Sequence, residues 1–241
     1  MLSAAKTALR TIFKRYGRHI IYVPRLELTG FDLAHDLQIL IDKPDPLIFD
    51  VGANVGQSID LFQRLFPGGR ILAFEPDPDS FHELASKYDS EHIQLFQIAL
   101  SEEEGKGELH RYEKSVLNSL LQLNRTADNC FASIKSIGSV DVATRTVDSV
   151  VNELGIAQLD LLKVDTQGLD YKVLLGARQA FVQRRVRAVL IELNFDPLYR
   201  GQAQAETVNQ YLNNNGLHLI DYYEKVRRGK RLSWCTALFA N

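Results

Sequence analysis

The amino-acid sequence predicts an α/β fold with a doubly wound, mostly parallel sheet, and three observations support this. Leu47–Val51 is an apolar run around Asp50, and a turn containing Gly52 and Gly56 follows it. A segment with helical periodicity at 58–66 comes next, so the stretch indicates a strand, a tight turn and a helix. Further apolar runs alternate with helical segments, as in parallel strands joined by crossover helices, at 71–74, 93–100, 159–165 and 188–192.

Composition limits the class of protein. The chain has 241 residues and 45% hydrophobic content, which suits one domain at 47–241 with an N-terminal helical extension at 1–46. A formal charge of −2 and a pI near 6.3 argue against a nucleic-acid binder. Cys130 and Cys235 fit no metal or redox spacing, and no run reaches the roughly 20 residues of a membrane span. With no signal peptide recognised, we expect a cytoplasmic protein.

The extension begins with an amphipathic helix whose apolar residues recur every three or four positions. Several basic residues and no acid lie among them before Glu27. Two alternatives stay open: the helix contacts an anionic membrane surface or an acidic partner, or it packs its apolar stripe on the domain. A second helical run spans 31–41 and is ended by Pro44 and Pro46.

The turn after the first strand indicates which ligand it serves. A dinucleotide turn would follow the pattern Gly-x-Gly-x-x-Gly, whereas Asn54 occupies its third position here. Asp50 precedes the first glycine and would repel a pyrophosphate but attract an amine or a sulfonium. Glu75 ends the second strand, where an acid accepts hydrogen bonds from a ribose diol. Together they indicate S-adenosylmethionine (SAM); the alternative is a structural turn with a solvated Glu75.

The region from 71 to 145 contains more than a plain doubly wound fold requires. A helix is expected from about Asp79, capped by Asp79 or Ser80, before a third strand at 93–100. Alternating segments at 108–112 and 140–145 predict two further strands around a polar stretch. This insertion is too long for an ordinary connection. It forms either a lid or acceptor-site wall, or a hairpin that covers a sheet edge.

Three motifs in this order resemble the FkbM family of class I SAM-dependent methyltransferases. They are 49–56 (FDVGANVG), 73–76 (AFEP) and 161–168 (LLKVDTQG), and the resemblance runs from about Phe31 to Glu192. It implies a Rossmann-like sheet of seven strands with a reversed last strand. It also implies cofactor contacts, at Asp50, Gly52, Asn54, Gly56, Glu75, Pro76, Ala99 and Asp165. The helix at 31–41 would lie beside the cofactor, which makes His35 a candidate base or acceptor contact; the alternative is a surface histidine.

Asp165 and Glu192 are the main candidates for catalysis. Each ends an apolar strand, and ligands bind beyond the carboxyl ends of such strands. Asp165 would remove the proton of an acceptor hydroxyl or bind a divalent metal that acidifies this hydroxyl; the further alternative is that it caps the following helix. Lys163 falls on the same face of the strand as Asp165 and needs a carboxylate partner.

One position departs from the family pattern. The family usually has Lys-hydrophobic-Asp-hydrophobic-Glu-Gly, and this chain has Gln167 in place of the glutamate. Gln167 keeps the hydrogen-bonding capacity and loses the charge, so we expect no metal site.

The C-terminal part predicts a helix at 206–213 and a closing antiparallel hairpin, at 217–223 and 234–239. Its turn carries five basic residues, which either meet an anionic acceptor or are solvated. The expected function is SAM-dependent O-methylation of a sugar or glycosylated metabolite, where oxygen and sugar are implied by the resemblance. The alternatives are a non-catalytic SAM-binding scaffold and a nicotinamide-dependent oxidoreductase. The expected partner is a small-molecule or glycan acceptor, with no nucleic acid.

Overall fold

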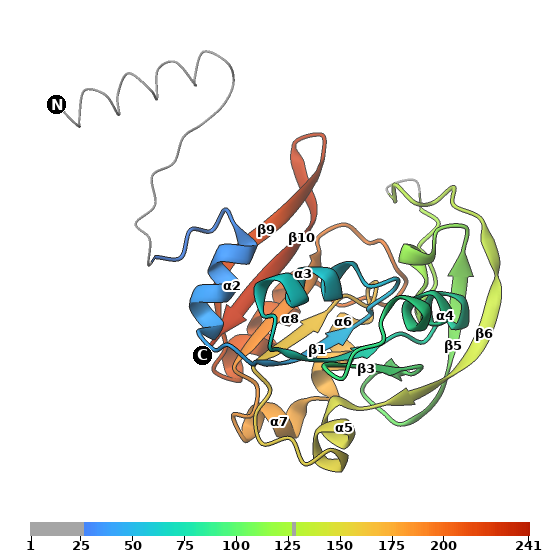
Figure 1. The fold of residues 1–241 in the computed structure, drawn as a ribbon. Helices are drawn as coiled ribbons and strands as arrows, with labels where there is room; N and C mark the ends of the chain where they lie inside the picture. The colour runs from blue at the N-terminus through green and yellow to red at the C-terminus, as the bar shows by residue number, and fades with distance from the viewer. Residues whose placement is uncertain (1–26, 127–128) are drawn as a thin grey trace, which may run out of the picture.

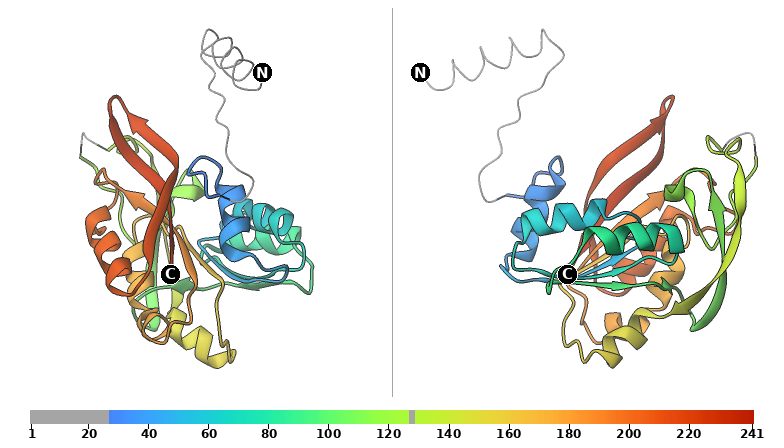
Figure 2. Two further views of the ribbon diagram at one scale, coloured as in Figure 1. Left: turned by 90° about the vertical axis from the view of Figure 1, so that its left-hand side faces the viewer. Right: turned by 45° about the vertical axis from the view of Figure 1, so that its right-hand side comes forward.

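A seven-stranded sheet with helices on both faces forms the body of the protein (Figure 1, Figure 2). The computed structural model describes residues 27–126 and 129–241, so the predicted amphipathic helix near the N-terminus lies outside the described residues. The strand order is β3-β2-β1-β7-β8-β10-β9. Its strands are β1 Leu47–Val51, β2 Arg70–Phe74, β3 Ile93–Phe96, β7 Leu161–Val164, β8 Ala188–Asn194, β9 His218–Arg228 and β10 Arg231–Ala240.

The strand directions confirm the predicted fold class. Strands β3, β2, β1, β7 and β8 pair in parallel, whereas β10 runs antiparallel to both β8 and β9. Val51 at the end of β1 pairs with Phe74 of β2 and with Val164 of β7. From β1 the chain adds β2 and β3 on one side of the sheet and later β7 and β8 on the other side. Ligands bind in the crevice where the strand order reverses in this way.

The helices divide between the two faces of the sheet. Apolar residues of α5 Val147–Glu153, α6 Asp170–Leu175, α7 Arg178–Val182 and α8 Ala205–Asn214 pack into one cluster with Phe49. On the other face, α2 Leu33–Ile41, α3 Gln57–Leu65 and α4 Pro78–Lys87 pack around Ile48. The alternation of Ile48 and Phe49 follows from the two-residue period of a strand.

Helix α2 is held to the sheet by a buried acid as well as by apolar contacts. Leu37 and Ile41 lie in the same apolar cluster as Leu238 of β10. Asp36 accepts hydrogen bonds from the backbone of Thr29 and from the Tyr223 hydroxyl, at 2.8 and 2.7 Å. The segment before β1 therefore packs on the β9–β10 end of the sheet.

Two predicted boundaries were wrong. Helix α4 is capped by Asp77, which accepts from Ser80 N at 3.0 Å, because Pro78 takes the first helical position, where no N–H is needed. The third predicted strand also ends early, at Phe96. Its partner β2 stops before Pro76, which has no N–H to continue the ladder.

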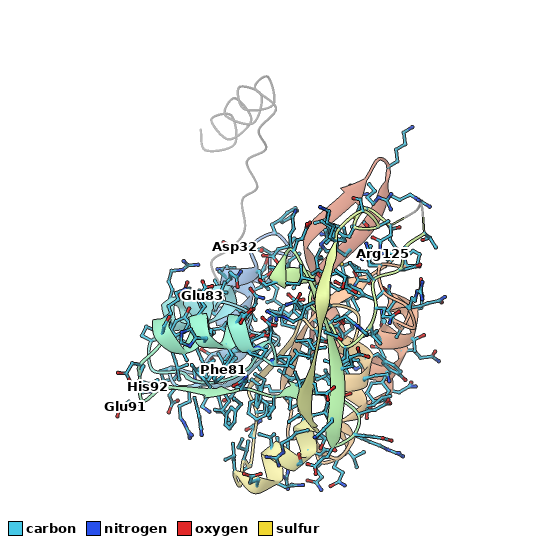
Figure 3. All side chains as sticks on the ribbon, turned by 90° about the vertical axis from the view of Figure 1, so that its right-hand side faces the viewer. Asp32, Phe81, Glu83, Glu91, His92 and Arg125 are labelled. Carbon is cyan, nitrogen blue, oxygen red and sulfur yellow. The ribbon has the colours of Figure 1, made fainter. Side chains whose placement is uncertain are left out.

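The predicted insertion is a second sheet of three strands, in the order β4-β6-β5. These strands are β4 Ala99–Leu100, β5 Gly105–Tyr112 and β6 Ser136–Arg145, and the short helix η1 Ser115–Leu117 follows β5. In Figure 3 the insertion faces the viewer, with Arg125 near its upper end; the guanidinium of Arg125 donates to the carbonyls of Ala132 and Ile134. Among the described residues no helix is long and apolar enough to cross a membrane.

Candidate active site

A cavity of about 400 Å³ lies where the carboxyl ends of β1, β2, β7 and β8 meet. Its volume falls in the range of sites that enclose a cofactor-sized ligand. The insertion contributes one wall, and α2 and the β9–β10 hairpin contribute others. Most predicted site residues line it: Gly52, Asn54, Glu75, Pro76, Ala99, Asp165 and Glu192.

Asp50 lies behind the cavity and not in its lining. The carboxylate is fully buried, with Oδ1 2.9 Å from Lys163 Nζ, and it accepts a short hydrogen bond from the Ser58 hydroxyl. Lys163 also donates to the carbonyl of Gly52 at 2.9 Å. Burial acts to lower the pKa of Lys163, but the nearby Asp50 and Asp165 carboxylates outweigh it and the pKa is raised. Asp50 therefore does not face a cationic ligand as expected; it is the predicted partner of Lys163 and fixes the loop through it.

The two loop glycines are required by the protein itself. A Cβ on Gly52 would lie 1.9 Å from the backbone oxygen of Asp165. A Cβ on Gly56 would lie 2.4 Å from the Tyr88 ring, and Gly56 is not in the cavity lining. Both have positive φ, 78° and 93°, which glycine adopts without strain. Gly56 therefore has a structural role in place of the ligand contact expected of it, whereas Gly52 avoids this clash and also lines the cavity.

Glu75 and Asn54 form one polar wall. Glu75 Oε2 accepts from Asn54 N and Oε1 accepts from Asp77 N, each at 2.8 Å. Burial raises the pKa of Glu75 to about 7, although these two bonds oppose the rise. Asn54 has a positive φ of 47°, and its buried Oδ1 has no hydrogen-bond partner in the described part of the chain. The oxygen atoms of this wall can therefore accept further hydrogen bonds.

Asp165 is oriented by a chain of side chains. Its Oδ1 accepts from Gln167 Nε2 at 2.8 Å, and the Tyr199 hydroxyl lies 2.9 Å from Gln167 Oε1. An ionised carboxylate only accepts hydrogen bonds, so this order places the amide nitrogen of Gln167 toward Asp165. The second oxygen, Oδ2, has no hydrogen-bond partner among the described residues and belongs to a side chain that lines the cavity.

Asp165 does not cap α6, whose N-cap position is Leu169 and has no side-chain cap hydrogen bond; the loop before the helix is held by Asp170 instead. Asp170 accepts from Thr166 N at 2.8 Å and from Gly168 N at 3.0 Å, at the start of α6. Burial raises the pKa of Asp170 to about 6, although the bonds to Thr166 oppose this. Asp165 is therefore left to the cavity.

Glu192 lies on the same side of the cavity as Asp165. Asn194 Nδ2 donates to Glu192 Oε1 at 3.0 Å. Burial raises the pKa of Glu192 well above its ordinary value, and the Asp165 and Asp170 carboxylates raise it further. Two carboxyl groups at adjacent strand ends thus have different environments, as in sites that use one as acid and one as base.

His35 is not brought to the cavity. Its Nε2 lies 3.2 Å from the carbonyl oxygen of Glu27, and it is absent from the cavity lining, to which α2 contributes Leu33 instead. This is the surface position that we gave as the alternative.

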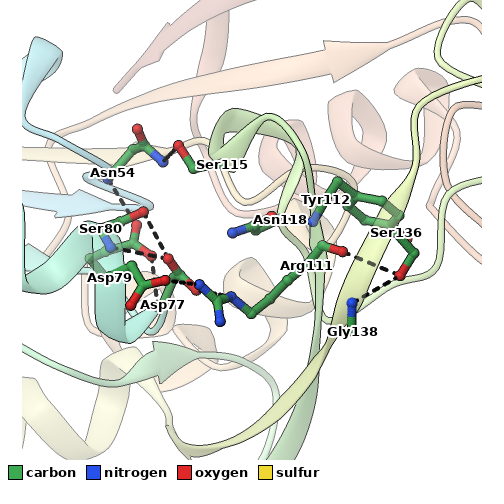
Figure 4. Close-up of polar contacts among 11 residues, drawn as sticks. Asn54, Asp77, Asp79, Ser80, Arg111, Tyr112, Ser115, Asn118, Ser136 and Gly138 are labelled. Atoms are coloured by element: carbon green, nitrogen blue, oxygen red, sulfur yellow. Dashed lines mark hydrogen bonds and ion pairs between the residues drawn. The ribbon is translucent and has the colours of Figure 1, made fainter.

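The insertion touches the cavity loops at three points, and Figure 4 shows the two that involve Arg111 and Ser115. Arg111 Nε lies 2.7 Å from Asp77 Oδ1 beyond β2, and the same guanidinium bonds Asp79. Ser115 accepts from Asn54 Nδ2 at 3.4 Å beyond β1. Ser119 Oγ donates to Gln167 O at 2.8 Å beyond β7. The insertion is therefore a wall of the cavity and not only an edge cover.

No group of three or more His, Cys, Asp or Glu side chains within 27–126 and 129–241 has a geometry that suits a metal ion. Next to Asp165, where a third carboxylate would stand in the family pattern, the structure has the amide of Gln167. At this position the chain therefore offers an amide and not a carboxylate oxygen as a metal ligand beside Asp165.

Comparison with known proteins gives a consistent result. A profile of the Methyltransferase FkbM domain matches residues 50–219. The 2-O-methyltransferase NoeI of Sinorhizobium fredii is 28% identical, over 68% of this chain and 69% of that protein. The 31-O-demethyl-FK506 methyltransferase FkbM of Streptomyces tacrolimicus is 29% identical, over 67% and 69%. The hexuronic acid methyltransferase AglP of Haloferax volcanii is 24% identical, over 66% and 61%.

A solved structure shows the same fold. The methyltransferase FkbM from Methylobacillus flagellatus aligns with a TM-score of 0.52 at 15% identity, over 82% of this chain and 44% of that chain.

Proposed function

Because this chain belongs to the FkbM family of methyltransferases, we propose that it binds SAM in the cavity and methylates a hydroxyl oxygen of a sugar or glycosylated metabolite. The observation that carries this proposal is the convergence of Glu75 and Asp165 on one cavity from the ends of β2 and β7. The first supplies acceptors for a ribose diol, and the second supplies a base for an acceptor hydroxyl.

The residues of the β1 and β2 ends fit the cofactor. Each Glu75 oxygen uses one lone pair on a backbone N–H and keeps capacity for a ribose hydroxyl. Asn54 offers the unpartnered Oδ1, and Pro76 and Ala99 line the wall beyond Glu75. When bound, SAM supplies a methyl group on a positively charged sulfur. The negative side chains around the cavity favour that charge.

On the acceptor side, Asp165 and Glu192 take different roles. Gln167 holds Oδ1 of Asp165, so Oδ2 is the atom that receives the hydroxyl proton. Burial and neighbouring carboxylates raise the pKa of Glu192, so it remains protonated to higher pH and can donate a hydrogen bond to the acceptor. Because an amide occupies position 167, the proposed reaction needs no metal to position Asp165.

The relatives support an oxygen acceptor. Two of them carry an O-methyl position in their names, and a third is named for hexuronic acid, a sugar derivative. We extend this to a small-molecule or glycan acceptor here. We also place the enzyme in the cytoplasm, because Cys130 and Cys235 are far apart in the sequence and fit no redox spacing, which is simplest for a chain from a reducing compartment.

One experiment tests the proposal. Cell extract is incubated with the enzyme and methyl-labelled SAM, and untargeted mass spectrometry searches for labelled products. We expect label on a hydroxyl oxygen with the wild-type protein and much less with Asp165→Asn. Calorimetry with SAM, S-adenosylhomocysteine (SAH) and NAD identifies the cofactor separately. Tight SAH binding with no labelled product would favour the scaffold alternative, and NAD binding would favour an oxidoreductase.

A further inference from the structure

We infer that the acceptor unit carrying the reacting hydroxyl is uncharged or amine-bearing, and that the cavity selects against carboxylated and phosphorylated units. The inference rests on the proposed function, since it concerns the same cavity. Family membership alone does not indicate whether the acceptor is charged, because one relative is named for an acidic sugar. The inference names the acceptor class for this chain.

The first ground is the charge of the cavity lining. Four carboxyl groups line it, from Glu75, Asp165, Glu192 and Glu224. In the described part of the chain the single cation of the lining is Lys163, and it is already engaged by Asp50 Oδ1 and by the carbonyl of Gly52, each at 2.9 Å. No cationic side chain of the lining is therefore left to pair with a carboxylate or phosphate on the acceptor.

The second ground is the field at the place of reaction. The pKa of Glu192 is raised by burial and by the negative charges of Asp165 and Asp170. An anionic group placed beside these residues would meet the same repulsion, which is strong in a partly enclosed site. Glu192 is protonated in the proposed reaction, so the negative charges beside it are those of Asp165 and Asp170.

The basic tip of the β9–β10 hairpin does not alter this inference for the reacting unit. Arg227, Lys230 and Arg231 are exposed near the turn, and none of them lines the cavity. The hairpin contributes Glu224 and Thr236 to the lining instead. The hairpin residues that line the cavity are therefore an acid and a hydroxyl.

A measurement without turnover tests the field directly. Paramagnetic relaxation enhancement of the backbone amide protons is measured by NMR on ¹⁵N-labelled protein with SAH at low salt. The enhancement caused by a cationic aminomethyl nitroxide is compared with that caused by a carboxylated nitroxide. The amides of Asn118, Ser119 and Gln167 report on the cavity. We expect the cationic probe to act at least about threefold more strongly there, because the local potential concentrates it. A ratio of one or below would overturn the inference and leave the proposed function intact.

Matched variants show where the effect comes from. Asp165→Asn should lower the ratio at the cavity amides, while Asp89→Asn, at an exposed site between α4 and β3, should not change it. An unchanged ratio in Asp165→Asn would contradict the assignment of the field to the cavity carboxylates.

The labelled products of the extract experiment give the second test. Fragmentation locates the labelled methyl group on one unit of the acceptor. We expect a neutral or amino sugar, or another polyol without an acidic group. Label on a uronate or phosphorylated unit would overturn the inference while confirming methyl transfer, whereas tight SAH binding without any label would count against the proposed function.

Discussion

Replacing Glu75 with glutamine tests the role given to the end of β2. The side chain is 6% exposed, and burial raises its pKa from 4.5 to about 7. Glutamine has the same shape but cannot ionise. Its amide nitrogen would also face one of the two backbone N–H donors, of Asn54 or Asp77, that the carboxylate now accepts.

The effect on stability follows from the sign of the pKa change. Between pH 4.5 and about 7 the folded protein holds a proton on Glu75 that the unfolded chain has released, so stability falls as pH rises through this window. The full change in pKa corresponds to about 3.4 kcal/mol, at about 1.36 kcal/mol per pKa unit. The free energy of unfolding of the wild type, minus that of Glu75→Gln, should therefore decrease by about 2.5 kcal/mol from pH 5 to pH 8, which is most of the full change.

The effect on cofactor affinity has the opposite pH dependence. The ribose hydroxyls donate to the ionised form, and at pH 6 about nine-tenths of Glu75 would be protonated. Wild-type affinity for SAH should thus rise about tenfold between pH 6 and pH 8. In Glu75→Gln it should be about 10- to 100-fold weaker at pH 8, from the loss of a charged hydrogen bond, and independent of pH in this range.

Two measurements check this reasoning: urea unfolding at pH 5, 6, 7 and 8, and calorimetric titration of SAH at pH 6, 7 and 8. Asp170 and Glu192 also have raised pKa values, and their contributions cancel in the difference between wild type and variant. If Glu75→Gln keeps the pH slope of the wild type and its affinity for SAH, then Glu75 is solvated in the folded protein and does not contact the cofactor.

Three further predictions concern the acceptor side, the metal and the loop. Asp165→Asn should keep SAH affinity within about threefold by calorimetry and lower methyl transfer about 10²- to 10⁴-fold, the usual contribution of a general base. EDTA should leave methyl transfer unchanged because Gln167 orients Asp165 without charge; loss restored by magnesium would contradict this. Gly56→Ala should reduce the free energy of unfolding in urea by about 2–4 kcal/mol, since its Cβ would overlap Tyr88 at a positive φ; a loss below about 0.5 kcal/mol would refute the overlap.

The parts of the site that the sequence predicted are those controlled by local pattern and sheet topology. A buried strand followed by glycines and a helical period identifies a strand end, and parallel strand ends share one edge. These two rules placed four residues at one edge of the sheet, and in the structure all four line one cavity: Asn54, Glu75, Asp165 and Glu192. The need of Lys163 for a carboxylate partner was also predictable, because an unpaired lysine is costly to bury.

What the sequence could not predict depends on contacts between distant segments. The reason for glycine at position 56 is a ring that packs from 32 residues away, at Tyr88. The orientation of Asp165 depends on Tyr199, again 32 residues from Gln167. His35 does not line the cavity, and the sequence could not predict this. A helical period indicates which residues of a helix are apolar, but it does not indicate which part of the helix lies near a ligand.

The insertion contacts the loops beyond β1 and β2 through Ser115 and Arg111, and a chain of contacts also joins it to Asp165. Its apolar residues Tyr112 and Leu117 pack with Tyr199, and Leu117 O lies 3.2 Å from the Tyr199 hydroxyl. That hydroxyl bonds Gln167, and Gln167 bonds Asp165, so the position of the base follows the position of the insertion. Glu75, in contrast, is held by backbone N–H groups of the main-sheet loops. Changes in the insertion should therefore alter the position of Asp165.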